Sequence, residues 1–315
     1  MKTLLLIDAH AMIHRAYHAL PDTLRTKDGT PTNAIYGFFL MLQKILIDFK
    51  PSHVAVCFDT PKPTFRKKLY TGYQAKRPPM EDLLRVQIPL IKDLLNLGGL
   101  TCLEKEGFEA DDVIGTLAEK LKKQFERVLI VTGDRDLLQL TDDTVYLVAP
   151  KRGVTNFDLF TPHEVFKKFG VTPEHIPDYK ALAGDSSDNY NTAKGIGPKT
   201  AQRLLAGNKT VEYLLDNLQD VENDRWRETL TEHKEQILLF KKIATIVRDV
   251  DVNPPQSQLA FTAFRPEMQS ELRKLELFTL TQKLYGDLDA QRENPKPILK
   301  KEEKKPIETD QMGLF

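Results

Sequence analysis

Close to the N-terminus the sequence reads Thr3-Leu4-Leu5-Leu6-Ile7-Asp8. An apolar run this short, ended by a polar residue, is typical of a strand buried on both faces of a parallel sheet. Four comparable runs follow along the chain, at His53–Phe58, Leu100–Leu103, Val128–Val131 and Val145–Ala149. Helical patterns separate most of these runs, and strands that alternate with helices predict a parallel α/β sheet.

Beyond about residue 160 the pattern changes from strands to helices. Thr161 and Pro162, with Glu164 two residues further on, make a good helix start, because threonine caps a helix and proline fits its first position. Helical periodicity then continues to about Leu284. We therefore predict an α/β domain over residues 1–170, a helical domain over 171–290, and a disordered tail over 291–315, which is rich in Lys, Glu and Pro.

The composition is that of an ordinary soluble protein. Of the 315 residues, 41% are hydrophobic and 29% are charged, and the formal net charge is zero. No apolar run is long enough to cross a bilayer, and Asp8 interrupts the only stretch near the N-terminus that resembles a signal peptide. Cys57 and Cys102 lie in apolar runs and are interpreted as buried thiols. We expect a cytoplasmic monomer without a membrane partner.

The charges are unevenly distributed. Six basic residues and no acid lie between Pro61 and Pro79, a segment called here the basic strip: Lys62, Arg66, Lys67, Lys68, Lys76 and Arg77. Such a strip can contact phosphates without reading a base sequence. A merely solvated loop is the alternative, and it is more plausible for Lys62 and Lys67 than for Lys76 and Arg77.

Acidic residues recur where strands end or helices begin. Asp8, Asp59 and Asp134 follow three of the expected strands, and Asp136 comes two residues after Asp134. The carboxyl ends of parallel strands meet at one edge of a sheet, which is where ligands bind. Five further acids lie at a helix start or three residues apart on an expected helical turn: Glu109, Asp111, Asp112, Asp185 and Asp188.

Carboxylates gathered in this way repel one another unless cations lie among them. They suit hard ions such as Mg²⁺ or Mn²⁺, and two such ions can promote hydrolysis of a phosphodiester. Any one of these acids alone fits a turn or a helix cap better, but nine in consistent positions favour a metal site. His10, His14 and His18 have helical spacing and are interpreted as a solvated face or as core histidines, with metal binding as the alternative.

The motifs that contain these residues match the motifs of one family, and they occur in the same order along residues 3–205. The chain resembles the 5′–3′ exonuclease domain of bacterial DNA polymerase I, within the wider flap endonuclease family. The matching segments are Leu6-Ile7-Asp8, Val56-Cys57-Phe58-Asp59, Pro63–Arg66, Lys76–Met80, Gly107–Gly115, Thr132–Asp136, Gly184–Asn189 and Gly195–Ala201. The resemblance implies a two-metal 5′ nuclease acting on DNA 5′ ends and 5′ flaps, with all nine acids at the metal site.

The resemblance also assigns the DNA contacts. Residues 62–97 would form a helical arch around a threaded 5′ strand, steered by Arg66, Lys76 and Arg77. Tyr73, together with Tyr70, would stack on bases. Gln74 of the arch would also contact DNA. A hairpin would bind the duplex backbone, with K⁺ as a candidate ion, through four residues: Gly195, Gly197, Lys199 and Thr200.

The sequence departs from the family at three places that would affect how DNA is positioned at the metal site. Gln74 stands where the family usually has a lysine thought to help at the scissile phosphate. Tyr190-Asn191-Thr192-Ala193 replaces the usual Ile-Pro-Gly-Val, and Ala9 replaces a frequent glycine. These changes keep open the alternative of a catalytically weak branch-binding, clamp-associated protein. A related single-strand ribonuclease is a second alternative, which the duplex-binding hairpin disfavours.

The last five residues are Gln311-Met312-Gly313-Leu314-Phe315. They resemble the peptide with which bacterial proteins bind the sliding clamp, with Gln311 as anchor and Leu314 and Phe315 for an apolar pocket. Only three positions define this resemblance, so a chance match is the alternative. We expect a stand-alone nuclease without a polymerase domain.

Overall fold

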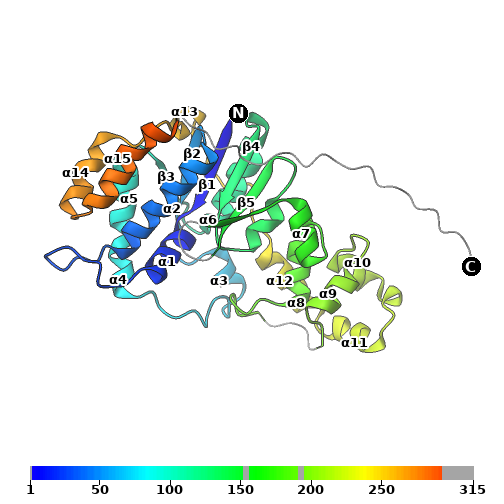
Figure 1. The fold of residues 1–315 in the computed structure, drawn as a ribbon. Coiled ribbons are helices and arrows are strands. Elements are labelled where there is room, and N and C mark those ends of the chain that lie inside the picture. Colours follow the sequence, from blue (N-terminus) through cyan, green and yellow to red (C-terminus); the bar gives the residue numbers. More distant parts are fainter. Residues whose placement is uncertain (1, 152–155, 191–194, 293–315) are drawn as a thin grey trace, which may run out of the picture.

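The computed structural model describes residues 2–151, 156–190 and 195–292, with side chains as far as Gly286. Within this part of the chain, the centre is a six-stranded sheet in the order β3-β2-β1-β4-β5-β6 (Figure 1). All neighbouring strands are parallel except β5 and β6. The predicted parallel α/β architecture is therefore confirmed. The strands are β1 (Thr3–Asp8), β2 (His53–Cys57), β3 (Thr101–Leu103), β4 (Arg127–Val131), β5 (Val145–Pro150) and β6 (Phe157–Phe160).

The first strand is buried on both faces, as its uninterrupted apolar sequence indicates. Leu4 and Leu6 contribute to the hydrophobic core on one face of the sheet, and Leu5 and Ile7 contribute to the core on the other. All four side chains are fully buried. Strand β6 was not predicted, because it has four residues, all of them half-buried, at the edge of the sheet.

Helices cover both faces of the sheet (Figure 1). The core on one face includes residues of α1 (Ala9–Ala19), α2 (Asn33–Phe49) and α5 (Gln87–Leu97). The core on the other face includes α6 (Ala110–Leu121) and continues into a helical unit. The elements of this second part are α7 (Pro162–Phe169), α8 (Ile176–Ala183), α9 (Pro198–Leu204), α10 (Val211–Asp216), α11 (Asp224–Glu232) and α12 (Lys234–Ala244).

The expected domain boundaries differ from the structure in two places. The helices α14 (Pro266–Lys274) and α15 (Phe278–Arg292) return to the sheet and pack against α5 and α2, because Met268, Leu272 and Leu280 join the core there. Residues 171–290 are therefore not one helical domain. The helix α5 was expected in the arch but belongs to the sheet core, and α4 (Asp82–Arg85) contributes Leu84 to the same core. The expected arch is therefore shorter than residues 62–97, and α3 (Phe65–Leu69) is the helix in its first part.

Two smaller expectations concern the thiols and the membrane. Cys57 and Cys102 are free thiols, the first buried and the second half-buried. None of the helices in the described ranges combines the length and apolarity needed to cross a bilayer.

Candidate active site

The acidic residues lie together at the point in the sheet where the strand order changes direction. Strand β1 lies between β2 and β4, so the chain leaves β1 towards one side of the sheet and later returns on the other. Such a reversal opens a crevice at the carboxyl ends of the strands. Asp8 ends β1, Asp59 follows β2 by two residues, and Asp134 follows β4 by three. The sheet therefore brings these three acids to one edge, called here the acidic edge.

Asp8 is fixed in place by hydrogen bonds. One carboxylate oxygen accepts the Ala11 N–H at 3.0 Å and so caps α1, and the other accepts the Thr132 hydroxyl at 2.7 Å. Its side chain is nonetheless buried beside other acids. Burial, followed by the charges of Asp59 and Asp134, raises the pKa of Asp8 to about 7. This carboxylate is thus held ready for a cation that would favour its ionised form.

The charge of Asp134 raises the pKa of several other carboxyl groups among the nine acids. Burial first, and then Asp134, raises the pKa of Asp111 well above its usual range, and the same two causes raise the pKa of Asp188. Asp134 itself accepts the Asp136 N–H at 2.8 Å, and its own N–H donates to Thr132 at 2.9 Å. Asp134 therefore lies at the electrostatic centre of the acidic edge.

Asp59 joins α1 to α6 at this edge. Its carboxylate accepts the Ala110 N–H at 2.8 Å, while His10 Nδ1 lies 3.4 Å from the other oxygen and 3.2 Å from the Asp59 N–H. His14 and His18 stack one turn further along α1, with ring centroids 6.3 Å apart. The histidine row is thus a helix face, with only His10 in contact with an acid of the edge.

Arg66 and Asp112 correct two predictions. The Arg66 side chain is 2% exposed, and its guanidinium donates to both oxygens of Asp112 at 2.7 and 2.8 Å. It also donates to the carbonyls of Ile243 and Thr245, and Asp112 accepts the Val247 N–H. In this structure Arg66 is therefore buried rather than placed to steer a threaded strand, and both carboxylate oxygens of Asp112 are occupied by internal donors. The pair joins α3, α6 and the loop after α12.

Tyr73 is buried and is not exposed for stacking on bases, in contrast to what the resemblance implied. Its ring is buried, and its hydroxyl donates to Glu109 at 3.1 Å. Glu109 also accepts from Thr64 at 3.2 Å and pairs with Arg66 at 3.2 Å. Burial, opposed by Arg66 and reinforced by Asp112 and Asp59, raises the pKa of Glu109 to about 7. Glu109 thus forms the border between the Arg66 network and the acidic edge. Tyr70 is half-buried and meets Phe240 edge-on.

Asp185 and Asp188 do not lie on a helical turn, contrary to expectation. The helix α8 ends at Ala183, Gly184 has a φ of +75°, and the next residues form a tight hairpin closed by hydrogen bonds between Asp185 and Tyr190. The two carboxylates therefore have different partners. Asp188 accepts from Arg77 at 2.7 Å and from Gln74 at 3.2 Å, whereas Asp185 accepts from Ser187.

Lys180 is a site residue that the sequence analysis missed. Its ammonium pairs with Asp136 and lies 2.6 Å from Asp185, so it connects the turn after β4 to the hairpin after α8. Burial opposes the ionisation of Asp185, but Lys180 prevails and lowers the pKa of that carboxyl. The sequence signal that could have identified Lys180 is its position, because it lies within one turn of the end of the helix that precedes Asp185. Asp136 and Asp185 are called here the outer pair.

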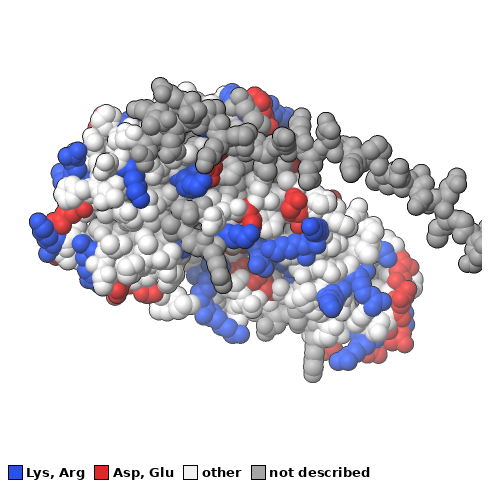
Figure 2. All heavy atoms as spheres, in the orientation of Figure 1, with Lys and Arg blue, Asp and Glu red and all other residues white. Residues whose placement is uncertain are grey.

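Gln74, within the basic strip, contacts the hairpin that contains Asp188. The Gln74 N–H donates to the Asp188 carbonyl at 3.0 Å, and Gln74 adopts a left-handed φ of +55°. Lys76 and Arg77 are exposed beside it, as are Lys67 and Lys68. On the face seen in Figure 2, Lys and Arg side chains gather along the junction between the sheet and the helices α7–α9, with acidic atoms beside them.

The expected duplex-binding hairpin is partly described. Gly195 has a φ of +98°, open space surrounds the position that a Cβ of Gly197 would take, and Lys199 is exposed at the start of α9, followed by the half-exposed Thr200. Tyr190 is buried against Phe240, with ring centroids 4.9 Å apart. Asn191, Thr192 and Ala193 lie outside the described residues, and so do the clamp-peptide positions Gln311, Leu314 and Phe315.

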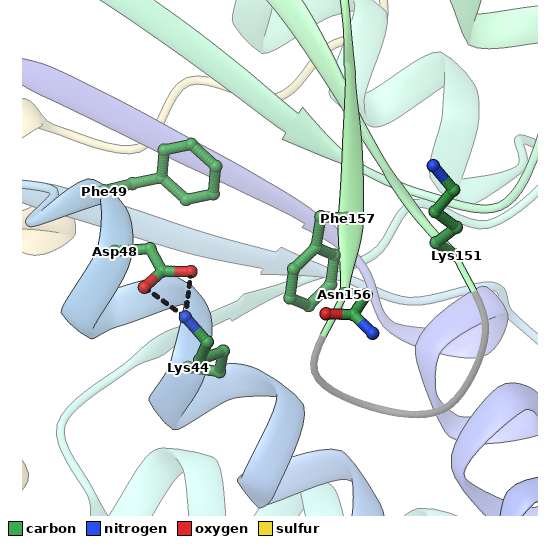
Figure 3. Close-up of a pocket in the computed structure, with 6 residues that line it drawn as sticks. All are labelled: Lys44, Asp48, Phe49, Lys151, Asn156 and Phe157. Carbon is green, nitrogen blue, oxygen red and sulfur yellow. Dashed lines mark hydrogen bonds and ion pairs between the residues drawn. The ribbon is translucent and has the colours of Figure 1, made fainter. Parts of the chain in front are cut away.

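A surface hollow lies elsewhere on the described part of the chain. Figure 3 shows it between the end of α2 and the strands β5 and β6, where Lys44 and Asp48 pair with each other. It contains none of the acids at the carboxyl ends of the strands. The candidate active site is therefore the acidic edge, where several carboxylates lie close together.

The donors of the acidic edge fit hard divalent ions, because they are carboxylate oxygens of raised pKa that lie close enough to repel one another. No group of three or more acidic, histidine or cysteine side chains within the described residues is already arranged as a metal site. Hydrogen bonds and internal cations hold the carboxylates instead, as for Asp8 by Thr132 and for Asp185 by Lys180.

Comparison with known proteins gives a consistent result. A family model described as 5′–3′ exonuclease, N-terminal resolvase-like domain matches residues 3–170, and one described as 5′–3′ exonuclease, C-terminal SAM fold matches residues 171–267. The 5′–3′ exonuclease of Aquifex aeolicus is 41% identical over 276 residues, which are 88% of this chain and 92% of that protein.

DNA polymerase I of Bacillus subtilis is 39% identical over 287 residues, and the match spans 91% of this chain but only 32% of the polymerase. Among solved structures, bacteriophage T5 D15 flap endonuclease in complex with DNA and metal ions shares the fold with a TM-score of 0.64 and 17% identity, over 93% of this chain and all of that one. These comparisons confirm the predicted fold and the predicted class of 5′ nuclease. The chain belongs to the 5′–3′ exonuclease family.

Proposed function

We propose that this chain is a structure-specific 5′ nuclease that hydrolyses DNA phosphodiesters at 5′ ends and 5′ flaps with divalent ions held at the acidic edge. The observation that carries the proposal is that Asp8 and Asp134, at the carboxyl ends of β1 and β4, lie near Asp111 at the start of α6. Burial, reinforced by the charges of neighbouring acids, raises the pKa of Asp8 and of Asp111, and cations bound there would favour the ionised carboxylates.

The residues proposed to hold the ions are seven aspartates, with Glu109 at the border: Asp8, Asp59, Asp111, Asp134, Asp136, Asp185 and Asp188. These residues would hold two Mg²⁺ or Mn²⁺ ions, which when bound would activate water and stabilise the leaving oxygen. Water then attacks phosphorus and the bond to the 3′ oxygen breaks, which leaves a 3′ hydroxyl and a 5′ phosphate.

The chain's own cations would bind and orient the DNA. Arg77 and Lys76 are exposed beside Asp188, where they can contact the phosphates of a threaded strand. Gly195, Gly197, Lys199 and Thr200 are proposed to contact duplex backbone, with Gln74 between the two groups. K⁺ at this hairpin is part of the same proposal.

The proposal also covers a protein partner and the location in the cell. The last residues, through Gln311, Leu314 and Phe315, would bind a bacterial sliding clamp and raise the local concentration of substrate. A monomer that binds duplex DNA in this way would be found with the nucleoid of the cytoplasm.

A flap assay tests the proposed activity. The substrate is a duplex with a 5′-labelled single-stranded flap, incubated with Mg²⁺, with Mn²⁺ or with EDTA, and compared with single-stranded RNA of the same sequence. We expect cleavage near the base of the DNA flap only when a divalent ion is present. Binding of the flap without cleavage would favour the branch-binding alternative, and preferred cleavage of the RNA would favour the ribonuclease.

A further inference from the structure

The outer pair is held together by a cation that belongs to the chain. The Lys180 side chain is 12% exposed and lies between two acids that are 9% and 13% exposed. Asp136 follows β4, while Asp185 begins the hairpin after α8, so the two carboxylates come from different parts of the fold. Without a cation between them, these two charges would repel across the junction.

The inner acids are arranged differently. Asp8, Asp111 and Asp134 form no ion pair with a lysine or arginine anywhere in the described ranges, and hydrogen bonds from Thr132 and Ala11 hold Asp8. Lysine is a compact charge on a flexible four-carbon stem, so its ammonium can leave a carboxylate without moving the helix that carries it. These properties suit Lys180 to the role of a replaceable occupant.

We propose that Lys180 is a positioning residue that keeps Asp136 and Asp185 together in the metal-free protein and that a divalent ion must displace to bind the outer pair. This inference rests on the proposed function. It makes Lys180 a competitor of the metal, so that its charge sets the concentration of divalent ion at which the outer pair is filled.

The test is the variant Lys180→Met, which keeps the aliphatic stem and removes the charge. Lys241→Met is the matched control, because Lys241 also joins two acids, Asp178 at 2.7 Å and Glu212 at 2.6 Å, away from the acidic edge. Binding of Mn²⁺ is measured by calorimetry, and the melting temperature is measured in EDTA and in Mn²⁺, both without DNA.

We expect Lys180→Met to bind Mn²⁺ about tenfold more tightly at its weaker site than the parent does, which corresponds to about 1.4 kcal/mol. Mn²⁺ should also raise its melting temperature by more than it raises that of the parent. Lys241→Met should equal the parent in both measurements. Lys180→Arg, which keeps the cation, should bind Mn²⁺ no more tightly than the parent and provides the test if the methionine variant does not fold.

The outcomes separate this inference from the proposed function. If the parent binds Mn²⁺ and Lys180→Met binds it equally or more weakly, Lys180 does not compete with the metal and only the inference fails. If the parent binds no Mn²⁺, the proposed function fails and the inference fails with it.

Discussion

Replacing Arg66 by methionine should destabilise the protein strongly, although the sequence suggested a DNA-contacting role for this residue. The guanidinium is 2% exposed and makes two hydrogen bonds to Asp112, whose side chain is fully buried. Removing one partner of a buried ion pair leaves the other charge uncompensated, which costs about 3–5 kcal/mol. The carbonyls of Ile243 and Thr245 would also lose their donor, which adds about 1 kcal/mol for each bond.

The measurement is the free energy of unfolding from urea titrations in EDTA. We expect Arg66→Met to lose at least about 3 kcal/mol, and Asp112→Asn in the same chain to restore part of the loss because it removes the uncompensated charge. Arg85→Met is the control. Its ion pair with Asp82 is exposed, so the loss should stay below about 1 kcal/mol. A loss below 1 kcal/mol for Arg66→Met, or no recovery in the double variant, would refute the reasoning.

The remaining predictions concern pH, Gln74 and the tail. The pKa of Asp8 rises from 3.8 to about 7 on folding, so the metal-free protein should lose stability as pH rises from about 4 to 7, by up to about 4 kcal/mol from this group. Unfolding titrations in EDTA should show that loss, and Asp8→Asn should reduce it; an equal slope in the variant would contradict the assignment. Gln74→Lys adds a cation where Gln74 now donates to Asp188, so single-turnover flap cleavage at low salt should become about tenfold faster, equivalent to 1.4 kcal/mol, with Gln74→Met as control; a rate no higher than that of the parent would speak against it. Deleting Gln311–Phe315 should weaken binding to a bacterial sliding clamp in a pull-down and leave flap cleavage without clamp unchanged, whereas undiminished clamp binding would exclude that role for the tail.

The fold could be predicted because the strands carry a strong local signal. Leu4 to Ile7 are apolar without interruption, which indicates burial on both faces of a parallel sheet, and both cores indeed draw on this strand. The acids after β1, β2 and β4 followed from the same signal, because parallel strands end at one edge. The return of α14 and α15 to the sheet could not be predicted, since their apolar periodicity shows that a face is buried but not which surface buries it.

The partners of individual charges were harder to predict for a related reason. Arg66 and Arg77 lie in one basic strip, yet one is buried against Asp112 and the other is exposed beside Asp188. Charge spacing along the chain does not distinguish these cases, because both partners are more than 40 residues away in sequence. For the same reason Tyr73 was expected at the DNA, whereas its hydroxyl completes a buried network with Glu109.

Asp134 is the residue on which the assignment of the active site depends most. Burial is the main cause that raises the pKa of Asp8, Asp111 and Asp188, and the charge of Asp134 raises all three further. The most direct test is the single-turnover rate of 5′-flap cleavage by Asp134→Asn in saturating Mg²⁺, with flap binding in EDTA measured beside it. We predict unchanged binding and a rate about a thousandfold lower, which corresponds to about 4 kcal/mol of lost transition-state stabilisation. Cleavage by Asp134→Asn at the rate of the parent would contradict the assignment of the acidic edge as the active site.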